Sequence, residues 1–186
     1  MTCPSVEPLK LRDGRVVAIR PLERCDRPLL DAAIRRLSDD SRYLRFASPK
    51  PRITERELDR LVDVDHHAHE ALLAIDPLTA HGVGVVRYVQ VSGQAGVVEL
   101  AATVADGWQG IGLGSALLVR LTQRASDEGH SALHASVLAV NRRSIAMLRR
   151  AGFRIRAASG VLLEYELALP ARQDQRHRAS SSDGAT

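Results

Sequence analysis

The stretch that decides the fold is residues 97–128, which read VVELAATVADGWQGIGLGSALLVRLTQRASDE. Its first eight residues are apolar or β-branched apart from Glu99, and this pattern predicts a strand. From Leu113 onward, leucine and alanine recur at helical spacing until Gly129, a typical C-cap residue, so a helix is expected. The glycine-rich turn 109–115 lies between them. A helix that starts there leaves backbone N–H groups unpaired at the positive end of its dipole, which favours phosphate binding.

Two common phosphate-binding motifs do not fit this turn. A P-loop requires Gly-Lys-Ser/Thr at the start of the helix, and no lysine follows Lys50 in the chain. The dinucleotide motif requires glycine or alanine where Ser115 stands, and it normally lies in the first strand-turn-helix unit of its domain. The pattern that does fit is Gln-x-x-Gly-x-Gly, formed by Gln109, Gly112 and Gly114. The competing interpretation is an ordinary connection between a strand and a helix.

A second signature follows at a fixed interval. It consists of Val-Leu-Ala-Val-Asn at 137–141, then Ser144, then Ala-Gly-Phe at 151–153. With the first motif it resembles the acetyl-CoA signature of the GNAT superfamily of N-acetyltransferases, over residues 97–153. The resemblance implies a mixed α/β fold with a mostly antiparallel sheet, splayed at the acetyl-CoA strand and with helices on both faces. It also implies acetyl-CoA as co-substrate and transfer of the acetyl group to a primary amine by direct attack in a ternary complex.

Composition narrows the function classes further. With 186 residues, 45% of them apolar, the chain fits one domain. We expect that domain at residues 8–169 and a disordered polar tail at 170–186. The chain has no apolar run long enough for a membrane span, no signal-peptide pattern at its start and two cysteines, which favours a cytoplasmic protein. The net charge is +4, but aromatic residues make up 3%, so nucleic-acid binding is not expected.

The pattern along the chain alternates helices with strands and argues for a mixed sheet covered on both faces. Asp26, followed by Pro28, is expected to cap a helix, and Thr54 with Glu57 forms a capping box. The predicted elements are a hairpin at 9–22, helices at 26–37, 38–46 and 54–62, strands at 71–75, 83–91, 97–104 and 132–138, a helix at 141–151, and strands at 154–157 and 162–167.

Glu99 is the candidate general base. In a strand it shares one face with Ala101 and Thr103, two small residues that leave room beside the carboxylate. A lysine-like amine is more than about 99.9% protonated at neutral pH, so a nearby carboxylate can take up the proton before attack. The competing interpretation is an ion pair with Arg87. The resemblance supports the assignment of Glu99 as the base. Lysine acetyltransferases of this superfamily carry a glutamate as general base ten residues before the first residue of the first motif, which is Gln109 here.

The resemblance also implies the remaining site roles. The N–H of Val104 would polarise the thioester carbonyl, Gln109 would orient the turn, and backbone amides of 110–115 would bind the pyrophosphate. Asn141 can be a helix N-cap, a pantetheine contact or both, and Ser144 a neighbour of CoA or a first-turn residue. The candidate catalytic residues are Glu99 and Val104; the candidate cofactor-binding residues are Thr103, Val104, Gln109, Gly110, Ile111, Gly112, Leu113, Gly114, Ser115, Asn141 and Ser144.

One departure from the family pattern bears on the acceptor. Many small-molecule acetyltransferases carry a tyrosine acid where this chain has Leu148. The bacterial protein-lysine acetyltransferase subgroup tends to lack it, and residues 37–46 and 64–67 resemble the early region of that subgroup. The resemblance therefore implies a protein lysine as acceptor. A small amine (a polyamine, an aminoglycoside or an amino acid) and a weakly catalytic CoA-binding regulatory module are the alternatives.

Two further expectations concern partners and metals. Superfamily members often dimerise, and the C-terminal strands 154–167 could serve a homodimer. His66 and His69 could share a helical face, but with His67 they lack the further ligands of a metal site, so none is expected. A solvated helix end is the preferred interpretation of these histidines, followed by the lining of the acceptor cleft.

Overall fold

The computed structural model of the protein describes residues 6–46 and 53–170. Among these residues, no helix is long and apolar enough to cross a membrane. The strands are β1 (Glu7–Lys10), β2 (Val16–Pro21), β3 (His69–Asp76), β4 (His81–Gln90), β5 (Val97–Val104), β6 (Ala132–Leu138), β7 (Arg154–Ser159) and β8 (Leu162–Ala168). The helices are α1 (Arg27–Arg35), α2 (Asp39–Phe46), α3 (Glu55–Val62), α4 (Leu113–Asp127) and α5 (Arg142–Arg150), with short 3-10 turns η1 (Arg24–Asp26) and η2 (Asp106–Trp108).

The strands form one eight-stranded sheet in the order β1-β2-β3-β4-β5-β6-β8-β7. Within the described chain, every neighbouring pair is antiparallel except β5 and β6, which run parallel. A parallel pair needs a crossover connection, and α4 provides it. The predicted mixed α/β class with a mostly antiparallel sheet is therefore confirmed.

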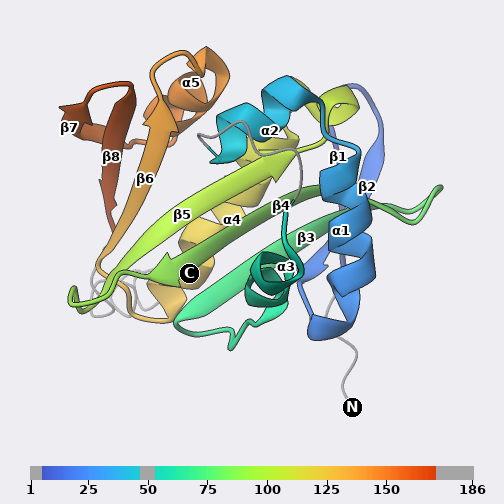
Figure 1. The fold of residues 1–186 in the computed structure, drawn as a ribbon, viewed down its shortest axis with the longest axis horizontal. Coiled ribbons are helices and arrows are strands. Elements are labelled where there is room, and N and C mark those ends of the chain that lie inside the picture. The colour runs from blue at the N-terminus through green and yellow to red at the C-terminus, as the bar shows by residue number, and fades with distance from the viewer. Residues whose placement is uncertain (1–5, 47–52, 171–186) are drawn as a thin grey trace, which may run out of the picture.

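Helices cover both faces of the sheet (Figure 1). α4 packs through Leu117, Leu118 and Leu121 against the face of β5 that carries Val98 and Leu100, the apolar side predicted from alternation. The opposite face of the sheet packs against α1 and α3 through a second cluster. The members of that cluster are Leu22, Leu30, Leu58, Val62, Ala71 and Leu73. Residues of β5 thus point alternately into the α4 core and toward the α1–α3 side.

Most of the predicted elements are found, with ends shifted by a few residues, and β6 has its predicted bounds. The Thr54 capping box is also confirmed: Thr54 Oγ1 accepts from Glu57 N–H at 3.3 Å, and Thr54 N–H donates to Glu57 Oε2 at 3.0 Å. The predicted tail lies outside the described residues except for Pro170.

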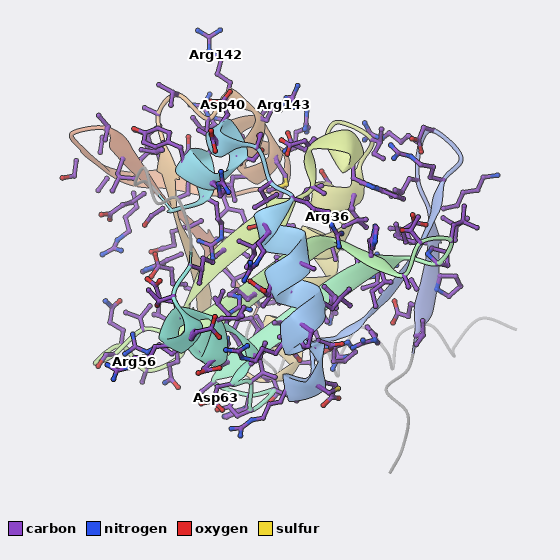
Figure 2. All side chains as sticks on the ribbon, turned by 45° about the vertical axis from the view of Figure 1, so that its right-hand side comes forward. Arg36, Asp40, Arg56, Asp63, Arg142 and Arg143 are labelled. Atoms are coloured by element: carbon purple, nitrogen blue, oxygen red, sulfur yellow. The ribbon has the colours of Figure 1, made fainter. Side chains whose placement is uncertain are left out.

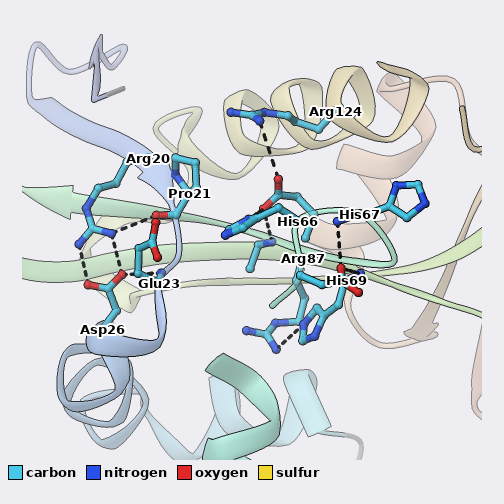
Figure 3. Close-up of polar contacts among 12 residues, drawn as sticks. Arg20, Pro21, Glu23, Asp26, His66, His67, His69, Arg87 and Arg124 are labelled. Carbon is cyan, nitrogen blue, oxygen red and sulfur yellow. Dashed lines mark hydrogen bonds and ion pairs between the residues drawn. The ribbon is translucent and has the colours of Figure 1, made fainter. Parts of the chain in front are cut away.

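One local prediction holds only in part, and another is wrong. Asp26 stands at the N-cap position of α1 but makes no capping bond, because its carboxylate is held by the guanidinium of Arg20 through two contacts of 2.6 Å (Figure 3). His66 and His69 do not share a helix. His66 lies in a turn with a φ of 60°, and His69 begins β3.

Candidate active site

The sheet opens between β5 and β6. These strands pair only from Val97–Ala132 to Leu100–Ala135. Beyond Leu100, β5 continues beside β4, whereas β6 continues beside β8, so the carboxyl ends of the two parallel strands diverge (Figure 1). Because backbone groups on the inner edges lose their strand partner there, this splay exposes hydrogen-bonding groups to a ligand.

Val104 is the last residue of β5 and faces the splay. Ala105 N–H donates to Val83 O of β4 at 2.9 Å. Since successive N–H groups of a strand point to opposite edges, the N–H of Val104 points away from β4, toward the side that β6 has left. The geometry therefore allows this N–H to donate to a carbonyl oxygen in the splay.

The glycine-rich turn begins five residues after Val104 and leads into α4. Gly110 and Gly112 have φ values of 80° and 99°, a region in which side chains are strained. Gly112 is the N-cap of α4 and, as a glycine, has no side chain with which to cap the helix. The first N–H groups of this 15-residue helix therefore lie unpaired at the positive end of its dipole, which suits an anion.

A cleft of about 760 Å³ joins the splay to this turn. It is lined by nine of the twelve candidate residues: Thr103, Val104, Gln109, Gly110, Gly112, Gly114, Ser115, Asn141 and Ser144. Two candidates contribute no side chain, because Leu113 is fully buried in the core and Ile111 packs against it. The third, Glu99, does not line the cleft. The role expected of Ile111 and Leu113 uses their backbone amides, so the burial of their side chains does not bear on it, and most of the candidate residues line one cleft.

Gln109 is the organising side chain of the turn. Its Nε2 donates to Val104 O and to Ser41 Oγ, both at 3.1 Å, and its Oε1 accepts from Arg143 Nη1 at 2.8 Å. A carbonyl can only accept and a guanidinium can only donate, so these partners fix the orientation of the amide. Gln109 therefore connects the end of β5 with α2 and α5.

Asp106 fixes α2 over the cleft. Its carboxylate accepts from Ser38 N–H and Ser38 Oγ, each at 2.9 Å, and from Ser41 Oγ at 2.6 Å. Burial acts to raise the pKa of Asp106, but the hydrogen bonds from Ser41 and Ser38 hold it below its usual value. Neither serine was a candidate, and a short polar run at the start of a helix gives no sign of a partner 65 residues away.

The cleft is basic, which the sequence did not reveal. Its lining holds the arginines Arg12, Arg45, Arg142, Arg143 and Arg150, against the aspartates Asp40 and Asp106. Asp40, Arg142 and Arg143 lie at the same end of the molecule (Figure 2). This excess of arginines suits a polyanionic ligand such as CoA.

Glu99 lies on the α1–α3 side of the sheet and is exposed. Its Oε1 accepts from Ser136 Oγ of β6 at 3.3 Å. Arg45 of α2, which lines the cleft, is electrostatically coupled to it: burial lowers the pKa of Arg45 and the Glu99 carboxylate acts to raise it. Glu99 therefore stands beside the cleft, at the level where β5 and β6 begin to diverge.

The alternative ion pair between Glu99 and Arg87 is not formed. Arg87 lies opposite Ala101 and is buried. Its guanidinium donates to Leu61 O at 2.6 Å and lies 3.4 Å from His69 Nε2 (Figure 3). Burial, together with the charge of Arg45, lowers the pKa of Arg87 to about 9, so the side chain stays charged at neutral pH.

Two residues near α5 bear on the candidate site: Asn141 of the second motif and Leu148, which stands at the position of the family's tyrosine. Asn141 caps α5, its Oδ1 accepting from Ser144 N–H at 3.1 Å, and it also lines the cleft. Leu148 is buried in the core, and at this turn of α5 the cleft is lined by Met147. No tyrosine is among the described residues that line the cleft.

The histidines lie at the other end of the sheet. His66 Nδ1 is 2.9 Å from the buried Glu70 (Figure 3), and His67 Nδ1 is 2.6 Å from Glu128. None of them lines the cleft. His66 and His67 contact Glu70 and Glu128, whereas His69 lies beside Arg87 on the other face of β3. His67 is exposed, as expected of a solvated position, but none of the three lies on a helix.

Comparison with known proteins gives a consistent result. Residues 17–154 match the family model described as acetyltransferase (GNAT) domain. Acetyltransferase PA5475 of Pseudomonas aeruginosa is 35% identical over 137 residues, 71% of this chain and 72% of that protein. The crystal structure of the GNAT domain of S. lividans PAT superposes with a TM-score of 0.83 at 27% identity, covering 90% of this chain and all of that one. Ribosomal-protein-alanine N-acetyltransferase of Brucella melitensis shares the fold, with a TM-score of 0.66 at 24% identity, over 81% of this chain and 99% of that one.

Proposed function

This chain belongs to the GNAT family of acetyltransferases and uses acetyl-CoA as co-substrate, and we propose that its acceptor is the side-chain amine of a protein lysine. The observation that carries the proposal is the exposure of Glu99 beside the splay. A binding site for a small amine buries most of the surface of its ligand. A carboxylate on an open face of the sheet, by contrast, is accessible to a lysine side chain on the surface of another protein. The resemblance of residues 37–46 and 64–67 to the early region of bacterial protein-lysine acetyltransferases supports the same acceptor class.

The proposed mechanism uses two groups of β5. The Glu99 carboxylate takes a proton from the lysine ammonium, directly or through a water, and the free amine attacks the thioester carbon. The N–H of Val104 donates to the oxyanion that forms. When the tetrahedral intermediate collapses, its C–S bond breaks and the CoA thiolate leaves, while the attacking nitrogen gives up its second proton to water, which completes the amide. Water protonates the thiolate, since Leu148 faces the core and the described lining of the cleft offers no tyrosine.

The proposal extends to the cellular location and the oligomeric state of the protein. We place the protein in the cytoplasm, in keeping with Cys25, which is exposed and forms no disulfide within the described residues. A homodimer through β7 is supported by the exposure of all six residues of this edge strand, because an open edge can pair with a second strand.

The test is product analysis by mass spectrometry. The purified protein is incubated with acetyl-CoA, lysine peptides with blocked N-termini, and a pool of polyamines, aminoglycosides and amino acids. We expect acetylated lysine side chains and unmodified small amines, and the Glu99→Gln variant should lose the product. Acetylation of a small amine with no lysine product would contradict the proposed acceptor and leave the family assignment intact.

A further inference from the structure

The first position of the phosphate-binding turn is a neutral residue in this chain. Gln109 stands where an arginine would bring a full positive charge next to the turn. The backbone N–H groups and the dipole of α4 supply only about half an elementary charge. A cofactor with several phosphate charges therefore calls for a cation from elsewhere in the fold.

Arg143 of α5 is held at this position by Gln109 itself. The bond from Arg143 Nη1 to Gln109 Oε1 is 2.8 Å long. Gln109 is in turn fixed by Val104 O and Ser41 Oγ, which leaves Oε1 as the group that can accept from an arginine. The side chain of Arg143 is therefore oriented by a glutamine that is itself oriented by the end of β5.

Arg143 has donors left for a ligand. A guanidinium carries five N–H groups, and Gln109 takes one of them. Within the described residues the others make no hydrogen bond, and Arg143 lines the same cleft as Gly110 and Gly112. It is exposed, so binding an anion requires no further rearrangement of the core.

We propose that Arg143, positioned by Gln109, binds the pyrophosphate of CoA and supplies the charge that an arginine at position 109 would supply. A planar guanidinium can donate two parallel hydrogen bonds to a phosphate, which makes arginine better suited to this role than a point charge. The inference depends on acetyl-CoA occupying this cleft and is independent of which amine is the acceptor.

The second arginine near the turn comes from the hairpin between β1 and β2. Arg12 N–H donates to Ile111 O at 3.3 Å, and its side chain lies beside Gly112, where an added Cβ would be 3.5 Å from Arg12 Nε. Arg12 thus flanks the turn on the α4 side, whereas Arg143 flanks its start. A substitution at Arg12 therefore distinguishes the contribution of this arginine to phosphate binding from that of Arg143.

The experiment measures the dissociation constants of CoA and of dephospho-CoA, which lacks the 3′-phosphate, by titration calorimetry. Arg143→Gln should weaken both ligands by the same factor, about tenfold for the loss of a charge-assisted hydrogen bond. It should also make binding less sensitive to salt, because one screened charge is gone. Arg149→Gln is the matched control: it removes the same charge from an exposed residue of α5 that does not line the cleft.

A second variant tests whether a positive charge at position 109 can replace that of Arg143. Gln109→Arg in the Arg143→Gln background should restore CoA affinity, because Val104 O and Ser41 Oγ can accept from an arginine at that position. Unchanged affinity in Arg143→Gln, or a loss confined to CoA and absent with dephospho-CoA, would overturn the proposal. So would a loss in Arg12→Gln with none in Arg143→Gln. Because binding needs no acceptor, this result is independent of the lysine proposal.

Discussion

Replacing Glu99 with glutamine removes the proposed base with little change in shape. The amide oxygen of the new side chain can still accept the 3.3 Å hydrogen bond from Ser136 Oγ. Glu99 is exposed, so no buried charge or cavity is created. We therefore expect the variant to fold and to bind acetyl-CoA as the wild type does, and any loss of rate to reflect chemistry.

The magnitude follows from the acceptor. A lysine amine with a pKa of about 10.4 is roughly 0.04% deprotonated at pH 7, a cost of about 4–5 kcal/mol for presenting the free base. A positioned general base typically recovers about 10²- to 10⁴-fold. Because Glu99 is exposed and water can replace it in part, we expect kcat/KM to fall toward the lower end of that range, about 10²- to 10³-fold at pH 7.

The pH dependence gives the sharper readout. Without a base the enzyme must capture amine that is already free, and that fraction grows about tenfold per pH unit below the amine pKa. The rate of the variant should therefore rise by about 100-fold between pH 7 and pH 9, and its deficit relative to wild type should shrink.

The assay follows release of the CoA thiol with a lysine peptide at saturating acetyl-CoA across this pH range. Glu164→Gln is the matched control, because Glu164 of β8 lies opposite Ser136 on the same sheet face and is partly exposed. A Glu99→Gln variant with wild-type kcat/KM, or with a pH profile parallel to wild type at a constant deficit, would refute the assignment of Glu99 as the base.

Three further predictions concern stability and the cleft. Leu117→Ala should lower the free energy of unfolding by about 2–5 kcal/mol in urea titrations, since Leu117 is 1% exposed; a smaller loss would mean that the core collapses around the cavity. Asp26→Asn should cost about 3 kcal/mol by leaving Arg20 unpaired. Burial acts to raise the pKa of Asp26, but hydrogen bonds from Arg20 and Glu23 N–H hold it below its usual value, so this stabilisation is present above about pH 4 and is lost on acidification. The melting temperature, measured between pH 7 and pH 3, should therefore decrease less with falling pH for Asp26→Asn than for wild type. An equal decrease in the two proteins would contradict this. Asp106→Asn should raise the dissociation constant of acetyl-CoA several-fold by loosening α2, and unchanged binding would mean that α2 needs no anchor.

The local elements were predictable because each depends on a short window of sequence. Alternation along 97–104 identified β5 and its two faces, and the glycines at 110 and 112 do occupy the positive φ values that such a turn requires. Thr54 and Glu57 predicted a helix start because a capping box is a contact between residues three apart. Side-chain periodicity and turn chemistry act over a few residues, so a single sequence carries them.

The sequence by itself thus determined the order of helices and strands, the position of the glycine turn before α4, and the placement of Glu99 on the sheet face opposite α4. Only the tertiary structure decided which distant residues complete the cleft. Arg12 and Arg143 line the cleft with the turn, although they come from a hairpin and a helix that are distant from it in sequence. Ser41 accepts a hydrogen bond from Gln109, 68 residues later in the chain. Arg87 is paired with Leu61 O and not with Glu99, because strand register, and not alternation, sets the neighbours of a side chain. Such contacts depend on how the elements pack, which spacing along one chain does not encode.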